Sequence, residues 1–463
     1  MKKIVLVTLL LCLLHSILLV NQNLGINVIL FSIPLLGWIV YCLKENKCIK
    51  NKKGLLWILP IILLSGTYFV FDHVLKYLNI VVIPVLYLLM YIYTMRPTNT
   101  IGDTIVEVLS LMIKPLNGIE NFTKDLIKSL GKGKKISPKT KKVIQSILIV
   151  LPIIIVVLIL LISADSIFGN LFKHIFDFEI DSLDEIIIRI FIFILLFFYL
   201  GSTMYFLTNN YLKETRVKKE YKEKDALTIN ILLISLDVIY VIFDIIQINS
   251  LLLHRVASNF NYAAYARSGF FQLMIISVIN IIIVLVSKKR KEESKTKVMS
   301  IIMIMLTYII IVSSFYRMFL YEQAYGYTVL RLGVYVLLIT EAILLIPTIV
   351  YIMNKKVNIL NWYMIISITI YCIINCCSVD CIIAKNNISR YHKTGKIDID
   401  YLKNGNYDNL NQLRELSKTI EKDNHLFEIE KDNLKIYINR MDKRNTTSIL
   451  EYNISKEKAK KRD

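Results

Sequence analysis

The 463-residue chain carries a formal net charge of +20 and is 55% hydrophobic, and its mean hydropathy is +0.54. Ordinary soluble proteins use about 45–50% apolar residues, so this composition excludes an ordinary soluble fold. Most of the positive charge lies beside apolar runs, where the orientation of membrane helices explains it, and we therefore predict no nucleic-acid partner.

Eleven apolar runs are of the length, about 17–25 residues, that a helix needs to cross the bilayer. Helices are the expected spans because lipid offers the backbone no hydrogen-bonding partner. The first run follows two lysines, and no small-residue cleavage site comes after it, so we expect it to remain as the first span. The predicted spans are residues 4–20, 24–43, 54–71, 78–95, 143–164, 185–207, 226–250, 269–287, 298–319, 332–353 and 359–383.

The predicted fold is all-α: a polytopic transmembrane helix bundle with a small, mainly helical soluble domain at the C-terminus. From Ala384 onward the composition changes to Lys, Asn, Asp and Glu with scattered Leu and Ile, which marks the start of that domain. The predicted parts are spans 1 to 4 at 1–95, a cytoplasmic amphipathic and basic loop at 96–142, spans 5 to 11 at 143–383, and an extracytoplasmic domain at 384–463.

The loop at 96–142 contains a candidate membrane-surface segment. Its apolar residues recur at helical spacing from Ile105 to Leu116, which favours a helix lying in the membrane interface. A basic cluster follows at 131–142, and such a cluster attracts anionic lipid by about 1 kcal/mol per charge. Anionic lipid is therefore a candidate partner, although a stop-transfer and orientation signal is the interpretation we favour.

The loops between the spans differ sharply in basic residues. If the N-terminus is cytoplasmic, the predicted cytoplasmic segments hold 31 Lys and Arg and the opposite loops hold five. Basic residues concentrate on the cytoplasmic side of membrane proteins. We therefore predict a multi-pass protein of the bacterial plasma membrane, with a cytoplasmic N-terminus and an extracytoplasmic C-terminal domain.

Three carboxylates lie well inside predicted spans. Asp237 and Asp244 are seven residues apart in the seventh span and so share one helix face, and Glu341 lies in the tenth span. An ionisable side chain at the centre of a span costs at least about 2.5–3.5 kcal/mol, so each requires a partner or a water-filled cavity.

With this orientation, several polar and aromatic stretches fall at the outer ends of spans. Arg267, Arg317 and Arg331, with Glu322 among them, would suit a phosphate or carboxylate ligand. The alternative is structural, in which ion pairs and interfacial tyrosines hold short outer loops between helices. The candidate pocket residues are Asp165, Gln247, Tyr262, Tyr265, Arg267, Arg317, Tyr321, Glu322, Tyr325 and Arg331.

Four of these polar stretches occur in a distinctive order across about residues 150–405. They are the surroundings of Asp165, the stretch 262–270, the stretch from Arg317 to Arg331, and residues 382–402. In this order they resemble an uncharacterised family of bacterial polytopic membrane proteins, catalogued only as a domain of unknown function. Lys385 stands where that pattern has arginine. The resemblance implies a membrane location and a similar span pattern, and it implies no activity.

Three classes of function remain open. The sequence lacks a phosphate-binding Gly-rich loop, His-Glu-x-x-His, Gly-x-Ser-x-Gly and paired metal-ligand motifs, so we predict no catalytic residue, metal or cofactor. The preferred class is a cell-envelope binding or structural component that engages lipid, wall polymer or a protein at its outer face. The second is a secondary transporter that uses the three intramembrane carboxylates. The third is a membrane enzyme for a lipid-linked substrate, with Glu322 or Asp165 as a base.

Overall fold

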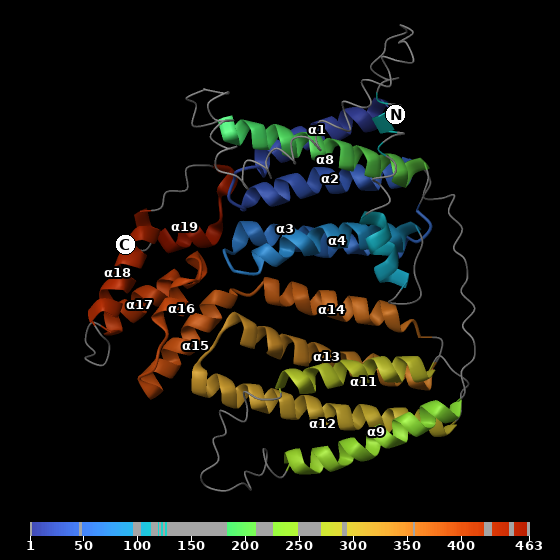
Figure 1. Cartoon of the computed structure of the whole chain (residues 1–463). Helices are drawn as coiled ribbons and strands as arrows, with labels where there is room; N and C mark the ends of the chain where they lie inside the picture. The colour runs from blue at the N-terminus through green and yellow to red at the C-terminus, as the bar shows by residue number, and fades with distance from the viewer. Residues whose placement is uncertain are drawn as a thin grey trace, which may run out of the picture. The chain divides into compact units, whose positions relative to one another are not determined.

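The structure is a computed structural model, and every regular element that it describes is a helix (Figure 1). The predicted all-α fold is therefore confirmed. The helices form two compact units. The described residues are 2–45, 49–95, 103–112, 119, 122–123, 126, 183–209, 226–248, 270–288, 294–354, 357–420, 428–443 and 449–460.

The first unit contains the N-terminal apolar helices. Asn27 holds the turn between the first two helices, because its Nδ2 donates to Leu18 O (2.7 Å) and its Oδ1 accepts from Gly25 N (2.8 Å). A segment near the C-terminus returns to this turn, where Ile26 N donates to Tyr452 O (3.1 Å). The helices of this unit are α1 (Lys2–Leu18), α2 (Ile26–Glu45), η1 (Lys52–Trp57), α3 (Ile58–Val70), most of α4 (Lys76–Met95), α8 (Leu183–Asn209) and η5 (Ile449–Glu451).

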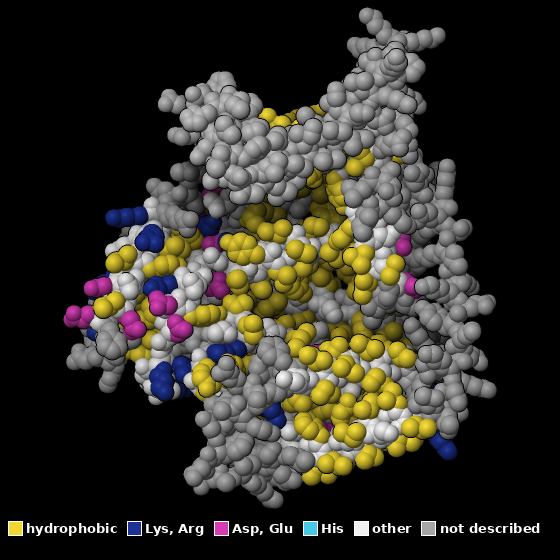
Figure 2. Space-filling view, viewed as in Figure 1, with side chains coloured by type: hydrophobic (Ala, Val, Ile, Leu, Met, Phe, Trp, Pro, Cys, Tyr) yellow, Lys and Arg dark blue, Asp and Glu magenta, His cyan; other side chains and the backbone are white. Residues whose placement is uncertain are grey.

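The second unit combines an apolar helix bundle with a group of shorter, polar helices. In Figure 2, hydrophobic side chains cover the exposed flank of the bundle, whereas charged side chains gather over the helices from α15 onward. The bundle consists of α9 (Ala226–Gln247), α11 (Phe270–Lys288), α12 (Ser294–Tyr325), α13 (Val329–Met353) and α14 (Ile359–Asn375). The polar helices are α15 (Val379–Thr394), α16 (Ile399–Lys403), η4 (Tyr407–Asn409), α17 (Leu410–Ile420), α18 (Glu428–Lys443) and α19 (Ile454–Lys460).

Long apolar helices identify the chain as a membrane protein. Five helices of the described residues are long and apolar enough to cross a bilayer, or six if one bent pair counts as a span. The described helices fall close to ten of the eleven predicted spans, and the predicted span at 143–164 lies outside the described residues. Part of the predicted interfacial helix is also described, and residues 103–112 are helical.

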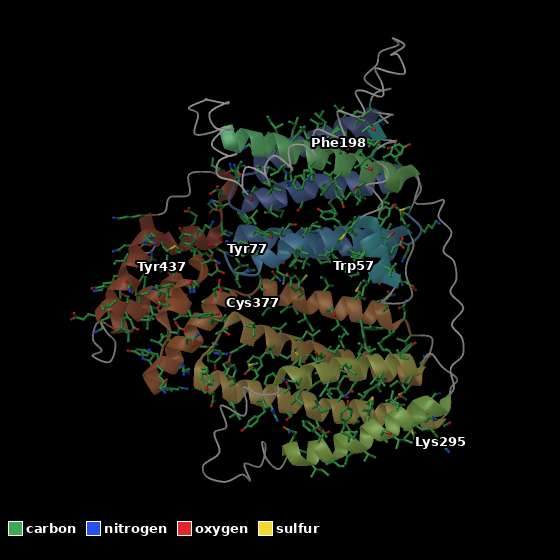
Figure 3. The ribbon with its side chains drawn as sticks, in the orientation of Figure 1. Trp57, Tyr77, Phe198, Lys295, Cys377 and Tyr437 are labelled. Carbon is green, nitrogen blue, oxygen red and sulfur yellow. The ribbon has the colours of Figure 1, made fainter. Side chains whose placement is uncertain are left out.

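The structure breaks the last predicted span, 359–383. Helices α14 and α15 meet at an angle of 65°, and Cys377 lies at the break (Figure 3). Beyond the break, Val379, Ile383 and Ala384 are buried in the core of the polar helices and not along an apolar helix face. The apolar run therefore continues past the point at which the helix turns.

The polar helices at the C-terminus have a hydrophobic core of their own. In α17, Leu410, Leu413, Leu416 and Ile420 are each fully buried, and their spacing places them on one helix face. They pack with residues of α15, α16, α18 and α19 in one cluster. The mainly helical character predicted for the C-terminal segment is therefore confirmed.

Side chains of α15 and α16 hold the turn between α12 and α13. The Asn387 side chain accepts from Tyr327 N (2.9 Å) and donates to Tyr327 O (2.8 Å). Arg390 donates to Ala324 O (2.6 Å) at the end of α12, and Val329 N at the start of α13 donates to Tyr401 Oη (2.8 Å). These contacts satisfy backbone groups that helix ends otherwise leave without partners.

Candidate functional site

One face of α9 is polar although the helix is apolar elsewhere. Asp237, Tyr240, Asp244 and Gln247 follow at spacings of three and four residues and share one side of the helix. Asp237 is 8% exposed and Asp244 is 2% exposed, whereas Ile239 is 57% exposed. The helix therefore turns its carboxylates inward and its apolar side chains outward, as expected of a span in lipid.

A hydrogen-bonded layer fixes α9, α11, α12 and α13 at one level. Tyr240 Oη donates to Asn280 Oδ1 (2.8 Å), and Asn280 Nδ2 donates to Thr307 Oγ1 (3.0 Å). Tyr308, the next residue of α12, donates from its hydroxyl to Ala342 O of α13 (2.9 Å). The side chains of the four helices therefore meet in one layer across the bundle.

Glu341 lies in this layer, at the centre of α13 and twelve residues from each end of that helix. Its side chain is 3% exposed, and its Oε2 forms a short hydrogen bond with the hydroxyl of Ser277 on α11. Ser277 is one helical turn from Asn280, which joins Glu341 to the same polar layer. The other carboxyl oxygen, Oε1, has no hydrogen-bond partner among the described residues.

The two carboxylates of α9 also face the interior of the bundle. Across the described part of the chain, neither oxygen of Asp244 has a hydrogen-bond partner, and Oδ1 of Asp237 has none. Asp237 is eleven residues from Ala226 and ten from Gln247, so it lies near the middle of α9. A charged carboxylate is costly at this depth, and a bound cation or a proton would neutralise it.

Buried polar contacts continue toward the end of α12 near Tyr325. Gln247 Oε1 accepts hydrogen bonds from Ser313 Oγ (3.0 Å) and from Arg317 Nη2 (2.9 Å). Gln247 lies one turn beyond Asp244 on the same face of α9. The polar face of α9 therefore leads from Asp237 to the guanidinium of Arg317.

Similar contacts continue toward the opposite end of α12. Ser287 Oγ and Ser300 Oγ lie 3.2 Å apart, and Thr296 Oγ1 donates to Asn230 Oδ1 (2.6 Å). From Thr296 to Arg317, α12 rises about 32 Å at 1.5 Å per residue. The hydrocarbon core of a bilayer is about 30 Å thick, so the polar groups extend over the whole length of a membrane crossing.

Four members of the predicted outer pocket form a group where α12 meets α13. The Arg331 guanidinium lies 4.4 Å from the ring centroid of Tyr321, whose ring centroid is 4.9 Å from that of Tyr325. Tyr335 Oη donates to Glu322 Oε2 (2.9 Å), and the positive charge of Arg331 acts on the Glu322 carboxylate. Arg331 Nη1 also donates to the backbone carbonyl of Gly326.

The other predicted pocket residues do not all fall in this group. Arg317 and Gln247 bind each other between α9 and α12. The remaining members lie outside the described residues, so the pocket as a whole stays a prediction; they are Asp165, Tyr262, Tyr265 and Arg267.

Several residues of the bundle layer are uncharged and escape a search for ionisable groups in apolar runs. Ser277, Asn280 and Ser287 recur on α11 at spacings of three and seven, which is a helical period. Thr307 occupies the matching face of α12. A search for neutral polar residues that share one face of an apolar helix would have found this set.

A second buried polar cluster lies outside the apolar spans. Asp408 accepts from the backbone N–H of Asp72 (2.8 Å) and from Ser378 Oγ (3.0 Å). Burial, together with the charge of Asp408, raises the pKa of Asp380 from its ordinary value of 3.8 to about 6. Burial lowers the pKa of His73, whose Nε2 lies 3.1 Å from Asn375 O. This cluster joins the segment before α4 to the break between α14 and α15.

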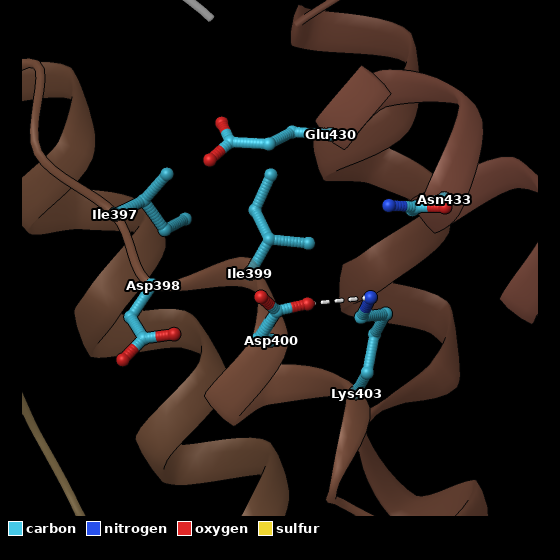
Figure 4. Close-up of a pocket in the computed structure, with 7 residues that line it drawn as sticks. All are labelled: Ile397, Asp398, Ile399, Asp400, Lys403, Glu430 and Asn433. Carbon is cyan, nitrogen blue, oxygen red and sulfur yellow. Dashed lines mark ion pairs between the residues drawn. The ribbon is translucent and has the colours of Figure 1, made fainter. Parts of the chain in front are cut away.

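The polar helices also contain a cavity of about 160 Å³ (Figure 4). Three of its charged groups are engaged: Lys403 Nζ pairs with Asp400 (2.6 Å), and Asp398 Oδ1 accepts from Tyr401 N (2.9 Å) at the start of α16. These contacts are a surface ion pair and a helix cap. The lining residues are Ile397, Asp398, Ile399, Asp400, Lys403, Glu430 and Asn433.

Carboxylates are rare in membrane helices, and those that occur face the interior of the bundle, as Asp237, Asp244 and Glu341 do here. Residues 58–416 match the family described as Domain of unknown function (DUF4153), and the chain belongs to this family. The match confirms the resemblance and extends it toward the N-terminus. No curated protein and no solved structure matches the chain.

Proposed function

We propose that the chain binds a cation between α9, α11, α12 and α13 and acts as a secondary transporter. One observation carries the proposal: Asp237 and Glu341 lie near the middle of their helices, with carboxyl oxygens that have no partner among the described residues. Coupling-ion sites of secondary transporters lie near the bilayer midplane. Polar contacts also occur along α12 from Thr296 to Arg317. They add support, because a transported ion needs polar groups on both sides of its site.

The chemistry of the layer argues for a functional role of these acids. Amides and hydroxyls, such as those of Asn280 and Thr307, are enough to tie helices together. A carboxylate adds a charge whose desolvation works against folding in lipid. Its presence at the midplane is explained if the charge binds a cation during function.

We also propose that the membrane is the plasma membrane, with α15 to α19 on its outer side. The difference of 31 against five basic residues between the two sets of loops supports this orientation. Lys295 lies at the end of α12 that is remote from α15 (Figure 3), so a basic end and the C-terminal helices occupy opposite ends of the bundle. The cytoplasmic end would then be the one that carries Thr296 and Asn230.

The cation site can be tested without knowing a transported substrate. The unfolding midpoint of purified protein would be measured in rising NaCl or KCl, with choline chloride holding ionic strength constant, and across pH. A ligand that binds only the native state raises the midpoint. We expect a response to at least one cation, the proton included, and its loss in Asp237→Asn combined with Glu341→Gln.

Glu430→Gln is the matched control, since it removes an exposed carboxylate of α18. The control should respond as the wild type does. Identical responses of the wild type and the double variant would contradict the cation site.

A second candidate is an envelope component that binds an anionic ligand at its outer face. The separate core of the C-terminal helices and the grouping of Arg331, Tyr321 and Glu322 favour it.

If the arginines bind a ligand, Arg317→Gln combined with Arg331→Gln should fold and accumulate normally. Native mass spectrometry would then show loss of a copurifying lipid, wall fragment or protein. Loss of the folded protein would mean that the arginines hold helices together. Anionic lipid at 131–142 remains a proposal of the same kind.

A further inference from the structure

The hydroxyl group of Ser277 has more acceptors around it than it has hydrogens. Its Oγ lies 2.7 Å from the backbone carbonyl of Met274 and in a short contact with Glu341 Oε2. A serine hydroxyl donates one hydrogen bond and can accept others. One hydrogen cannot serve both contacts, and the carbonyl of Met274 can only accept, so both contacts are hydrogen bonds only if that carbonyl takes the hydrogen of Ser277. The contact with Glu341 is then a hydrogen bond only if the carboxyl group is the donor.

We infer that Glu341 carries a proton in this structure, and that the cation of the bundle is the proton. The inference rests on the proposed cation site and names its ion. The neutral acid donates through Oε2 to Ser277, and its Oε1 is left as a carbonyl oxygen. A neutral carbonyl oxygen loses much less by burial than a charged carboxylate does, which accounts for an Oε1 without a partner among the described residues.

Among the described residues, the hydroxyls of the same layer are directed at acceptors other than Glu341. The hydrogen of Tyr240 goes to Asn280, an amide hydrogen of Asn280 goes to Thr307, and the hydrogen of Thr307 goes to Met303 O (2.7 Å). Tyr308 donates its hydrogen to Ala342 O. Each hydroxyl of the layer is therefore already directed at another acceptor.

The oxygen groups of the layer also suit a proton better than a metal ion. Hard cations in proteins are surrounded by several oxygen ligands at once. Among the described residues, no group of three or more His, Cys, Asp or Glu could hold a metal ion. A proton needs only one carboxyl oxygen and one acceptor, and Glu341 with Ser277 provides that pair.

Infrared spectroscopy tests the inference directly. The full-length protein in lipid nanodiscs at neutral pH would be compared with Glu341→Gln, and the difference spectrum should contain the carbonyl stretch of a protonated carboxyl group. Thr340→Val is the matched control, because it changes the adjacent residue, whose hydroxyl donates to Val336 O (2.6 Å), and it should keep the band. Loss of the stretches of an ionised carboxylate in Glu341→Gln would overturn the inference.

A second variant covers a failure of Glu341→Gln to fold. In Ser277→Ala the proton of Glu341 loses its acceptor, so the carbonyl band should move to higher frequency. An unmoved band would overturn the inference.

The outcomes also separate the inference from the proposed function. An ionised Glu341 whose replacement abolishes a sodium or potassium response leaves the cation site standing and removes the proton. A protonated Glu341, with cation and pH responses that stay unchanged in Asp237→Asn combined with Glu341→Gln, shows a proton that never dissociates and a bundle that binds no cation, which overturns both.

Discussion

Asn387 offers a quantitative test of how the C-terminal helices hold the bundle. Its side-chain amide binds both the N–H and the carbonyl of Tyr327, and Nδ2 also reaches Ile383 O (3.1 Å). Asn387→Ala leaves a backbone donor and a backbone acceptor of the turn without these partners. Each buried polar group left unsatisfied costs about 1–3 kcal/mol, and Tyr327 is half-buried, so we expect a total loss of about 2–4 kcal/mol.

The assay is thermal unfolding of purified protein, followed by intrinsic fluorescence in one detergent. Asn386→Ala makes the same deletion at the preceding residue, which is half-buried, and should change the free energy of unfolding by no more than about 0.5 kcal/mol. The midpoint of Asn387→Ala should therefore fall several degrees below that of Asn386→Ala. Equal midpoints would refute the role of Asn387 in fixing the turn.

Three further predictions concern the turn, the polar cluster and the orientation. Gly326 has a φ of +86°, and a Cβ there would lie 2.6 Å from Asn387 Oδ1, so Gly326→Ala should lose about 1–3 kcal/mol in the same unfolding assay; an unchanged midpoint would contradict this. The raised pKa of Asp380 means that the native state binds a proton more tightly than the unfolded chain, so stability falls as pH rises from about 4 to about 6 and stays low above that. Asp380→Asn should remove about 3 kcal/mol of this fall, and parallel pH curves for the variant and the wild type would refute it. A reporter enzyme fused after Asp463 should be active only outside the cytoplasm, and cytoplasmic activity would reverse the proposed orientation.

The apolar helices are largely predictable from the sequence because each needs only a long apolar run, whatever its neighbours are. The break after α14 is an exception. Cys376, Cys377 and Ser378 include neither proline nor glycine, and apart from Asp380 the residues from Val379 to Ile383 are apolar, so local hydropathy does not mark the 65° bend. The bend depends on tertiary packing, since Val379 and Ile383 enter the core of the C-terminal helices.

The carboxylates of the site are also visible in the sequence, because charges are rare in apolar runs. Their partners are not. Ser277 and Glu341 are 64 residues apart in the chain, and a serine in a membrane helix usually bonds within its own helix. Only the packing of α11 against α13 shows that the two meet.

The central claim is that Glu341 and Asp237 form an ion site at the middle of the membrane. A proton that binds there crosses part of the bilayer, so binding alone moves charge even without a transported substrate. Proteoliposomes adsorbed on a solid-supported membrane would be exposed to a rapid pH step while the transient current is recorded. We expect a transient in the wild type that is lost in Asp237→Asn combined with Glu341→Gln and kept in Glu430→Gln. An equal transient in the double variant, or none in the wild type, would contradict the account.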